Sequence, residues 1–159
     1  MTRILLLLSI GATLLQCQGD SKGMKAISYV NGTIVERPLS ASEQKSAAVI
    51  LEDLFAGTEE MLRVHVSDET IDAIRKTDTA VEFVFDTPVN FTSRMRGTFA
   101  VRRLLLPVTG DYAGSATDPV TTLFVADEQG FISGPLRNPV GRPLVLKLRE
   151  LVSPGSLHN

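Results

Sequence analysis

The residue with the clearest chemistry in this chain is Cys17, its only cysteine. It follows a basic residue, Arg3, and an apolar run over residues 4–15, about 12 residues long. This run is shorter than the roughly 20 residues that a helix needs to cross a bilayer. The pattern is typical of a secretory signal peptide, so we expect the chain to be exported.

Leu14-Leu15-Gln16-Cys17 resembles the lipobox of bacterial lipoprotein precursors. The resemblance implies a signal peptide over residues 1–16, acylation of the Cys17 thiol, and a membrane anchor at the new N-terminus. The family places Gly, Ala or Ser where this chain has Gln16. Because Gln18 is not Asp, the resemblance also implies the outer membrane, facing the periplasm or the cell surface. The alternative is ordinary cleavage after Gly19, which would discard Cys17.

Other residue types that support catalysis or metal binding are scattered. His65 is the only histidine inside the expected domain, and no serine lies in a Gly-x-Ser-x-Gly motif. Asp111 and Asp118 flank one loop without the spacing of a calcium-binding loop. The sequence therefore predicts no catalytic residues, no metal and no cofactor.

Two features are candidates for binding. Arg94, Arg96 and Arg102 are all at even-numbered positions, so on one regular strand their side chains would point to the same face of the sheet. We expect this face to include Arg63 and to bind an acidic partner, a small carboxylate ligand or a lipid headgroup. The alternative is a solvated face on which these cations pair with Glu82 across strands. The second candidate is the loop over 107–119, where Tyr112 is an aromatic contact residue.

The domain that must position these residues is predicted over 26–152, after a tether over 17–25 and before a frayed tail over 153–159. Asn31-Gly32 predicts a hairpin between strands 26–30 and 33–35, or a bulge in one strand. Ser40 and Glu43 form a capping box for a helix that ends near Ala56. A shorter helix is expected over 67–76.

The remaining segments read as strands. Alternating or β-branched residues predict strands over 61–66, 80–85, 96–106, 120–126 and 131–133, and Pro88 is expected to end the strand over 80–85. Residues 136–142 are expected to form a loop, and residues 143–151 a last strand or a short helix. The order predicts an α+β fold, with one long helix packed on a mostly antiparallel sheet and a second short helix. This layout is similar to cystatin-like and nuclear-transport-factor-like folds at the level of topology.

The net charge of the chain argues against one class of partner. The chain carries a net charge of −2, which becomes −3 without Arg3, so we expect no nucleic-acid partner. We expect an exported, lipid-anchored binding module whose partners are the membrane, through its lipidated N-terminus, and a protein or small acidic ligand. The alternatives are a periplasmic or secreted hydrolase inhibitor and an enzyme of an unrecognised class.

Overall fold

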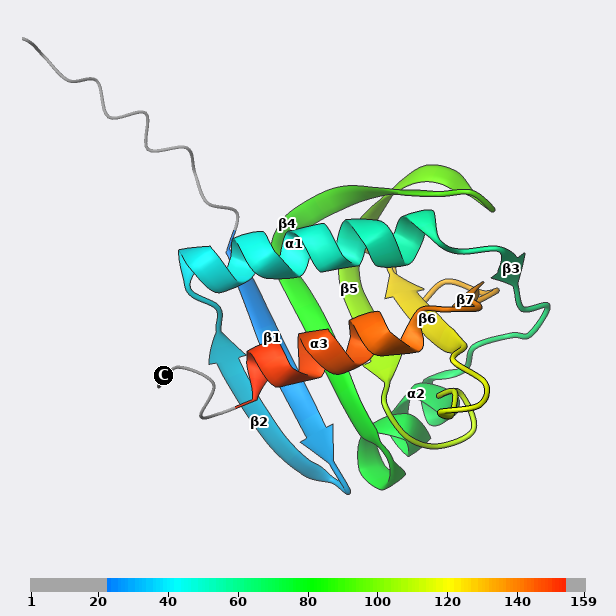
Figure 1. Ribbon diagram of the computed structural model, residues 1–159, viewed down its shortest axis with the longest axis horizontal. Helices are drawn as coiled ribbons and strands as arrows, with labels where there is room; N and C mark the ends of the chain where they lie inside the picture. The colour runs from blue at the N-terminus through cyan, green and yellow to red at the C-terminus, as the bar shows by residue number, and fades with distance from the viewer. Residues whose placement is uncertain (1–22, 154–159) are drawn as a thin grey trace, which may run out of the picture.

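The computed structural model describes residues 23–153. They form a seven-stranded sheet in the order β2-β1-β4-β5-β6-β7-β3, and each neighbouring pair of strands is antiparallel. Helices α1 and α3 lie on one face of this sheet, which we call the helix face, and α2 packs on the opposite, back face (Figure 1). The elements are β1 (Met24–Val30), β2 (Thr33–Pro38), α1 (Ala41–Ala56), β3 (Glu60–Met61), α2 (Asp68–Thr77), β4 (Thr79–Ser93), β5 (Gly97–Pro107), β6 (Thr121–Ala126), β7 (Leu136–Asn138) and α3 (Arg142–Val152).

The α+β class is confirmed, but the helix content differs from the prediction. Instead of one long and one short helix, the described residues hold three helices of 16, 10 and 11 residues. The additional helix is α3, which settles the choice between helix and strand for residues 143–151. Its buried residues, Val145, Leu148 and Val152, follow helical spacing, and a proline lies in its first turn. The sheet begins at Met24, inside the range predicted as tether.

Local signals near the N-terminus of the domain act as predicted. Asn31 and Gly32 both have positive φ angles, 48° and 81°, as the tight turn between β1 and β2 requires. The capping box at the start of α1 is present, and the helix ends at Gly57. These signals are local in sequence, so the hairpin and the start of the helix can be predicted without knowledge of the rest of the fold.

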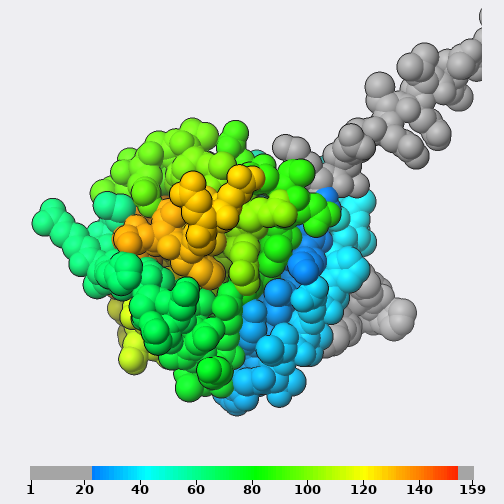
Figure 2. All heavy atoms as spheres, turned by 180° about the vertical axis from the view of Figure 1, so that it is seen from behind, coloured from blue at the N-terminus to red at the C-terminus, as the bar shows by residue number. Residues whose placement is uncertain are grey.

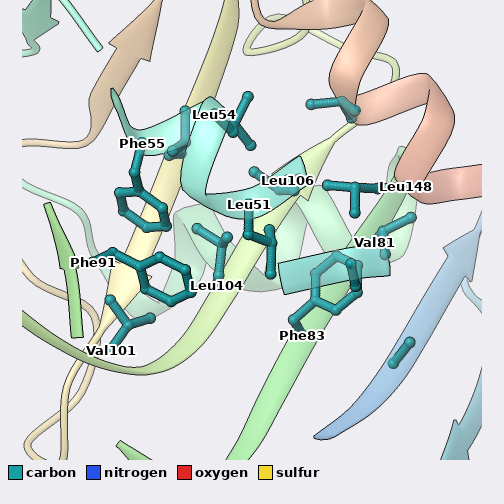
Figure 3. Packing of buried hydrophobic residues seen from close by; sticks show 14 of the residues in the cluster. Leu51, Leu54, Phe55, Val81, Phe83, Phe91, Val101, Leu104, Leu106 and Leu148 are labelled. Atoms are coloured by element: carbon teal, nitrogen blue, oxygen red, sulfur yellow. The ribbon is translucent and has the colours of Figure 1, made fainter. Parts of the chain in front are cut away.

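The main core lies between α1, α3 and the helix face (Figure 3). Phe55 at the end of α1 stacks on Phe91 of β4, with ring centroids 4.5 Å apart, and meets Phe99 of β5 edge-on at 5.7 Å. Leu51 and Leu104, from α1 and β5, are fully buried in the same cluster. Because aromatic residues of β4 and β5 pack on the end of α1, the long β4–β5 hairpin curls over that helix (Figure 1).

Three predicted strands differ from the structure. The strand predicted over 61–66 is reduced to β3, because its partner β7 has three residues and Pro135 precedes it without an N–H. β4 does not end at Pro88 but continues to Ser93, since Pro88 lies where the β4–β5 register shifts between Val84 and Val89. Residues 131–133 form only an isolated bridge between Ala126 and Phe131, and the loop expected over 136–142 contains β7.

Candidate functional site

A cavity of about 440 Å³ opens between α2 and the turn that follows β5. Tyr112, the aromatic residue expected to make binding contacts, lines it. The other lining residues come from α2 and from the two segments next to it: Glu69, Thr70, Ala73, Ile74, Thr77, Asp78, Gly110 and Asp111. The structure therefore places one of the predicted site residues beside a cavity of the size that takes a small molecule.

We call this cavity the α2 pocket. Hydrogen bonds and side-chain packing hold its two walls, α2 and the turn after β5, against each other. Thr79 is the first residue of β4, and its N–H donates to Thr109 Oγ1 at 2.8 Å while its carbonyl accepts from the N–H of Val108 and Thr109. Gly110 has a φ of +86°, and a side chain there would collide with the Asp78 carboxylate. The ring of Tyr112 meets Phe124 edge-on at 5.0 Å. The turn after β5 is thus fixed against the end of α2.

The α2 pocket is acidic. Glu69, Asp78 and Asp111 line it, and none of its lining residues is a lysine or an arginine. The pKa of the Glu69 carboxyl lies below its ordinary value because the Ser67 side chain and a backbone N–H donate hydrogen bonds to it, and His65 adds a smaller attraction. Carboxylates beside an aromatic ring form surroundings that favour an organic cation.

A buried charge cluster lies on the other side of α2, on the back face of the sheet. Glu82 of β4 is fully buried, and its carboxylate accepts from three side chains. Arg75 of α2 reaches Oε2 at 3.0 Å, Arg103 of β5 reaches Oε1 at 2.7 Å, and the Tyr29 hydroxyl of β1 donates at 2.8 Å. We call these four residues the Glu82 cluster. It joins α2 to three strands of the sheet.

Phe131 covers the two guanidinium groups of the Glu82 cluster. Its ring centroid is 5.6 Å from the central carbon of Arg75 and 5.8 Å from that of Arg103. In Figure 2, which shows the back face, the segment that contains Phe131 lies beside α2. Burial, followed by the charge of Glu82 and the hydrogen bond to it, raises the pKa of Tyr29 to about 12. The hydroxyl therefore stays protonated and donates to Glu82.

The four arginines predicted to share one face belong to separate segments. Arg63 follows β3, Arg94 and Arg96 lie in the turn between β4 and β5, and Arg102 is in β5 and donates to the carbonyl of Asp86. The expected alternation required one regular strand through these residues, but β5 begins at Gly97, after Arg94 and Arg96, and Arg102 lies beside the register shift between Val84 and Val89. Glu82, which the alternative interpretation paired with this group, binds Arg75 and Arg103 instead.

His65 has a serine neighbour that its sequence position does not reveal. Its Nδ1 lies 3.3 Å from Ser133 Oγ, and both residues are exposed. Neither residue lines the α2 pocket, and a nucleophile and its base need a cleft that holds the substrate. Among residues 23–153, no three His, Cys, Asp or Glu side chains come together in a way that could hold a metal ion.

The sequence singled out Tyr112 as a candidate binding residue but gave no sign of the acidic walls of the α2 pocket. Glu69 reads as a favourable charge in the first turn of a helix, and Asp111 as a residue of a solvated loop. Their shared site depends on α2 meeting a turn more than thirty residues later. Cys17 and the predicted signal peptide lie outside the residues that the structure describes.

Comparisons with protein-family models, with curated proteins and with solved structures find no match to this chain. None of the helices in residues 23–153 is both long enough and apolar enough to cross a membrane.

Proposed function

We propose that this chain is an exported binding module, anchored to the membrane by acylation of Cys17, whose ligand is a small organic cation. The observation that carries the proposal is the α2 pocket, with Tyr112 and three carboxylates in its wall and no cationic side chain there. A charged ammonium group would gain Coulomb attraction from the carboxylates and a cation–π contact with the ring. This ligand class replaces the small acidic ligand expected from the arginines.

The proposed anchor would hold the domain close to the bilayer. Residues 18–22 separate Cys17 from Gly23, where the described domain begins. An extended chain spans at most about 3.6 Å per residue, so this segment limits how far the domain can move from the membrane. Two or three acyl chains are enough for stable attachment, at about 0.8 kcal/mol for each buried CH₂ group.

The first test is the intact mass of the mature protein from the membrane fraction of its native host. We expect a chain that begins at Cys17 and carries acyl groups. An unmodified chain that begins near Asp20 would remove the anchor from the proposal and leave a soluble exported protein. The cation site does not depend on this result, because the α2 pocket lies within the folded domain.

The second test is titration with spermidine, followed by tyrosine fluorescence. The chain has no tryptophan and two tyrosines, and Tyr29 is buried, so the signal that changes on binding is expected from Tyr112. Replacing Asp78 and Asp111 by Asn should weaken binding by about tenfold for each carboxylate, which corresponds to roughly 1.4 kcal/mol. Added salt should weaken binding to the unmodified protein.

Asp53→Asn provides the matched control for this titration. It removes one carboxylate from an exposed position on α1, which packs on the helix face and not beside the pocket. If Asp78→Asn, Asp111→Asn and Asp53→Asn, tested one at a time, bind spermidine equally well, the pocket is not a cation site. Glutamate at the same concentration should give no response.

A further inference from the structure

Within residues 23–153, β2 is the one long edge of the sheet that has no strand paired on its outer side. The opposite edge is β3, which has two residues, whereas β2 has six and all but one of them are exposed. Figure 1 shows β2 at the outer edge of the sheet, with β1 on its inner side. Ile34 and Val35 on this strand are 63% and 41% exposed. An exposed edge with apolar side chains is a template for pairing with another strand.

The register of the β1–β2 hairpin determines which backbone groups point outward. Val30 and Thr33 close the two-residue turn, so they form a hydrogen-bonded pair, and such pairs then alternate along the ladder. The bond from the N–H of Leu39 to the carbonyl of Met24 agrees with this alternation. Thr33, Val35 and Arg37 therefore bond to β1, and the N–H groups of Ile34 and Glu36 face outward. Pro38, the next outward position, has no N–H.

We propose that β2 pairs with β2 of a second copy of this chain, antiparallel, with Val35 opposite Val35 of the other copy. In this register, Ile34 of each copy lies opposite Glu36 of the other, so the outward N–H groups of both residues donate to carbonyls across the two-fold axis. On the helix face, the Val35 side chains of the two copies contact each other. On the back face, the Ile34 side chain of each copy lies beside Glu36 of the other. The two sheets become continuous.

Neighbouring registers are less favourable. A shift of the axis by one residue toward Pro38 places Glu36 directly opposite Glu36 of the other copy, and two like charges at that distance repel. It also places Ile34 opposite Pro38, which has no N–H to donate. The shift in the other direction brings Gly32 of the turn opposite Glu36 and leaves less of the strand paired. The register centred on Val35 is therefore the self-complementary one.

The proposed pairing predicts at which position of β2 an introduced cysteine can form a disulfide with the same position of the other copy. Val35 would sit in a non-hydrogen-bonded pair, where opposing Cα atoms are about 4.5 Å apart, within the range that a disulfide spans. In full-length protein with Cys17→Ala, we expect Val35→Cys to give a covalent dimer under mild oxidation. Ile34→Cys should stay monomeric, because its copies lie diagonally apart. Ile34 is the more exposed of the two positions, so random collisions would favour the opposite result.

Sedimentation of the protein without introduced cysteines completes the test. The parent protein should sediment as a dimer and Glu36→Pro as a monomer, because proline removes an outward N–H and leaves the bonds to β1 intact. Circular dichroism checks that this variant folds, and Ile34→Lys provides a second block at the same edge. A monomeric parent protein, or equal disulfide yields from the cysteine variants at 34 and 35, would overturn the proposal. Neither outcome depends on acylation or on spermidine binding.

Discussion

Replacing both Arg75 and Arg103 by methionine should destabilise the domain by about 3–5 kcal/mol, the usual cost of removing the partners of a buried ion. Glu82 is fully buried, and the double variant would leave its carboxylate with the Tyr29 hydroxyl as its remaining partner in the cluster. Each single variant should cost less, since one guanidinium group would still bind the carboxylate. Urea unfolding at pH 7 measures the difference.

A triple variant separates the effect of an unpaired charge from the effect of lost packing. If Glu82 is also replaced by methionine, the cluster becomes apolar, and such replacements are often neutral or stabilising. We expect the triple variant to recover most of the stability that the double variant loses. A double variant that loses less than about 1 kcal/mol would mean that Glu82 is not held by these arginines.

The Glu82 cluster also helps to hold α2, which forms one wall of the α2 pocket, on the back face of the sheet. Arg75 is the residue of α2 that reaches the buried carboxylate; the same helix supplies Glu69 to the pocket, and Asp78 is the residue that caps its C-terminus. The apolar contacts of Ile71 and Ile74 hold the helix to the back face as well. A variant that disturbs this attachment should therefore lose spermidine binding in addition to stability, which the spermidine titration can detect.

The sequence predicted those elements whose signals are local. The turn at Asn31-Gly32 and the helix that begins after Ser40 depend on residues within a few positions of each other. The end of β4 could not be predicted in this way, because a proline usually ends a strand, and the register shift that tolerates Pro88 depends on pairing with β5. For α3, alternate leucines suggested a strand, while Val145, Leu148 and Val152 follow the helical spacing that the structure shows.

The candidate site was less predictable than the fold for the same reason. Arg75 and Glu82 are seven residues apart on a helix and a strand, and Arg103 comes twenty-one residues later on the next strand. Nothing in the local pattern distinguishes these two arginines from Arg94 or Arg96. The strand alternation placed Arg102 with the binding group, and the register shift near this position changes how that alternation maps onto the sheet. Which of the arginines bind Glu82 is decided by how α2, β4 and β5 pack together.

Acid should weaken the fold through Glu43, at the start of α1. Its carboxylate is nearly buried and forms two hydrogen bonds with Arg37, at 2.8 and 3.2 Å, while the backbone N–H of Ser40 donates at 2.8 Å. The Arg37 hydrogen bond and those from Ser40 outweigh burial and lower the pKa of Glu43 from 4.5 to about 2. Arg37 also donates to the carbonyls of Leu151 and Val152, so the same group joins α1 to the end of α3.

The direction of the pH effect follows from this lowered pKa. The unfolded chain binds the proton near pH 4.5 and the folded chain near pH 2, so the stability from Glu43 is complete above pH 4.5 and is lost as the pH falls toward 2. The loss should be about 2–3 kcal/mol, allowing for the partial exposure of Arg37. Glu43→Gln should be less stable than the parent protein at pH 7 and nearly equal to it at pH 2. Thermal unfolding across this range checks both. If the two proteins differ by the same amount at every pH, Glu43 contributes through packing and not through its charge.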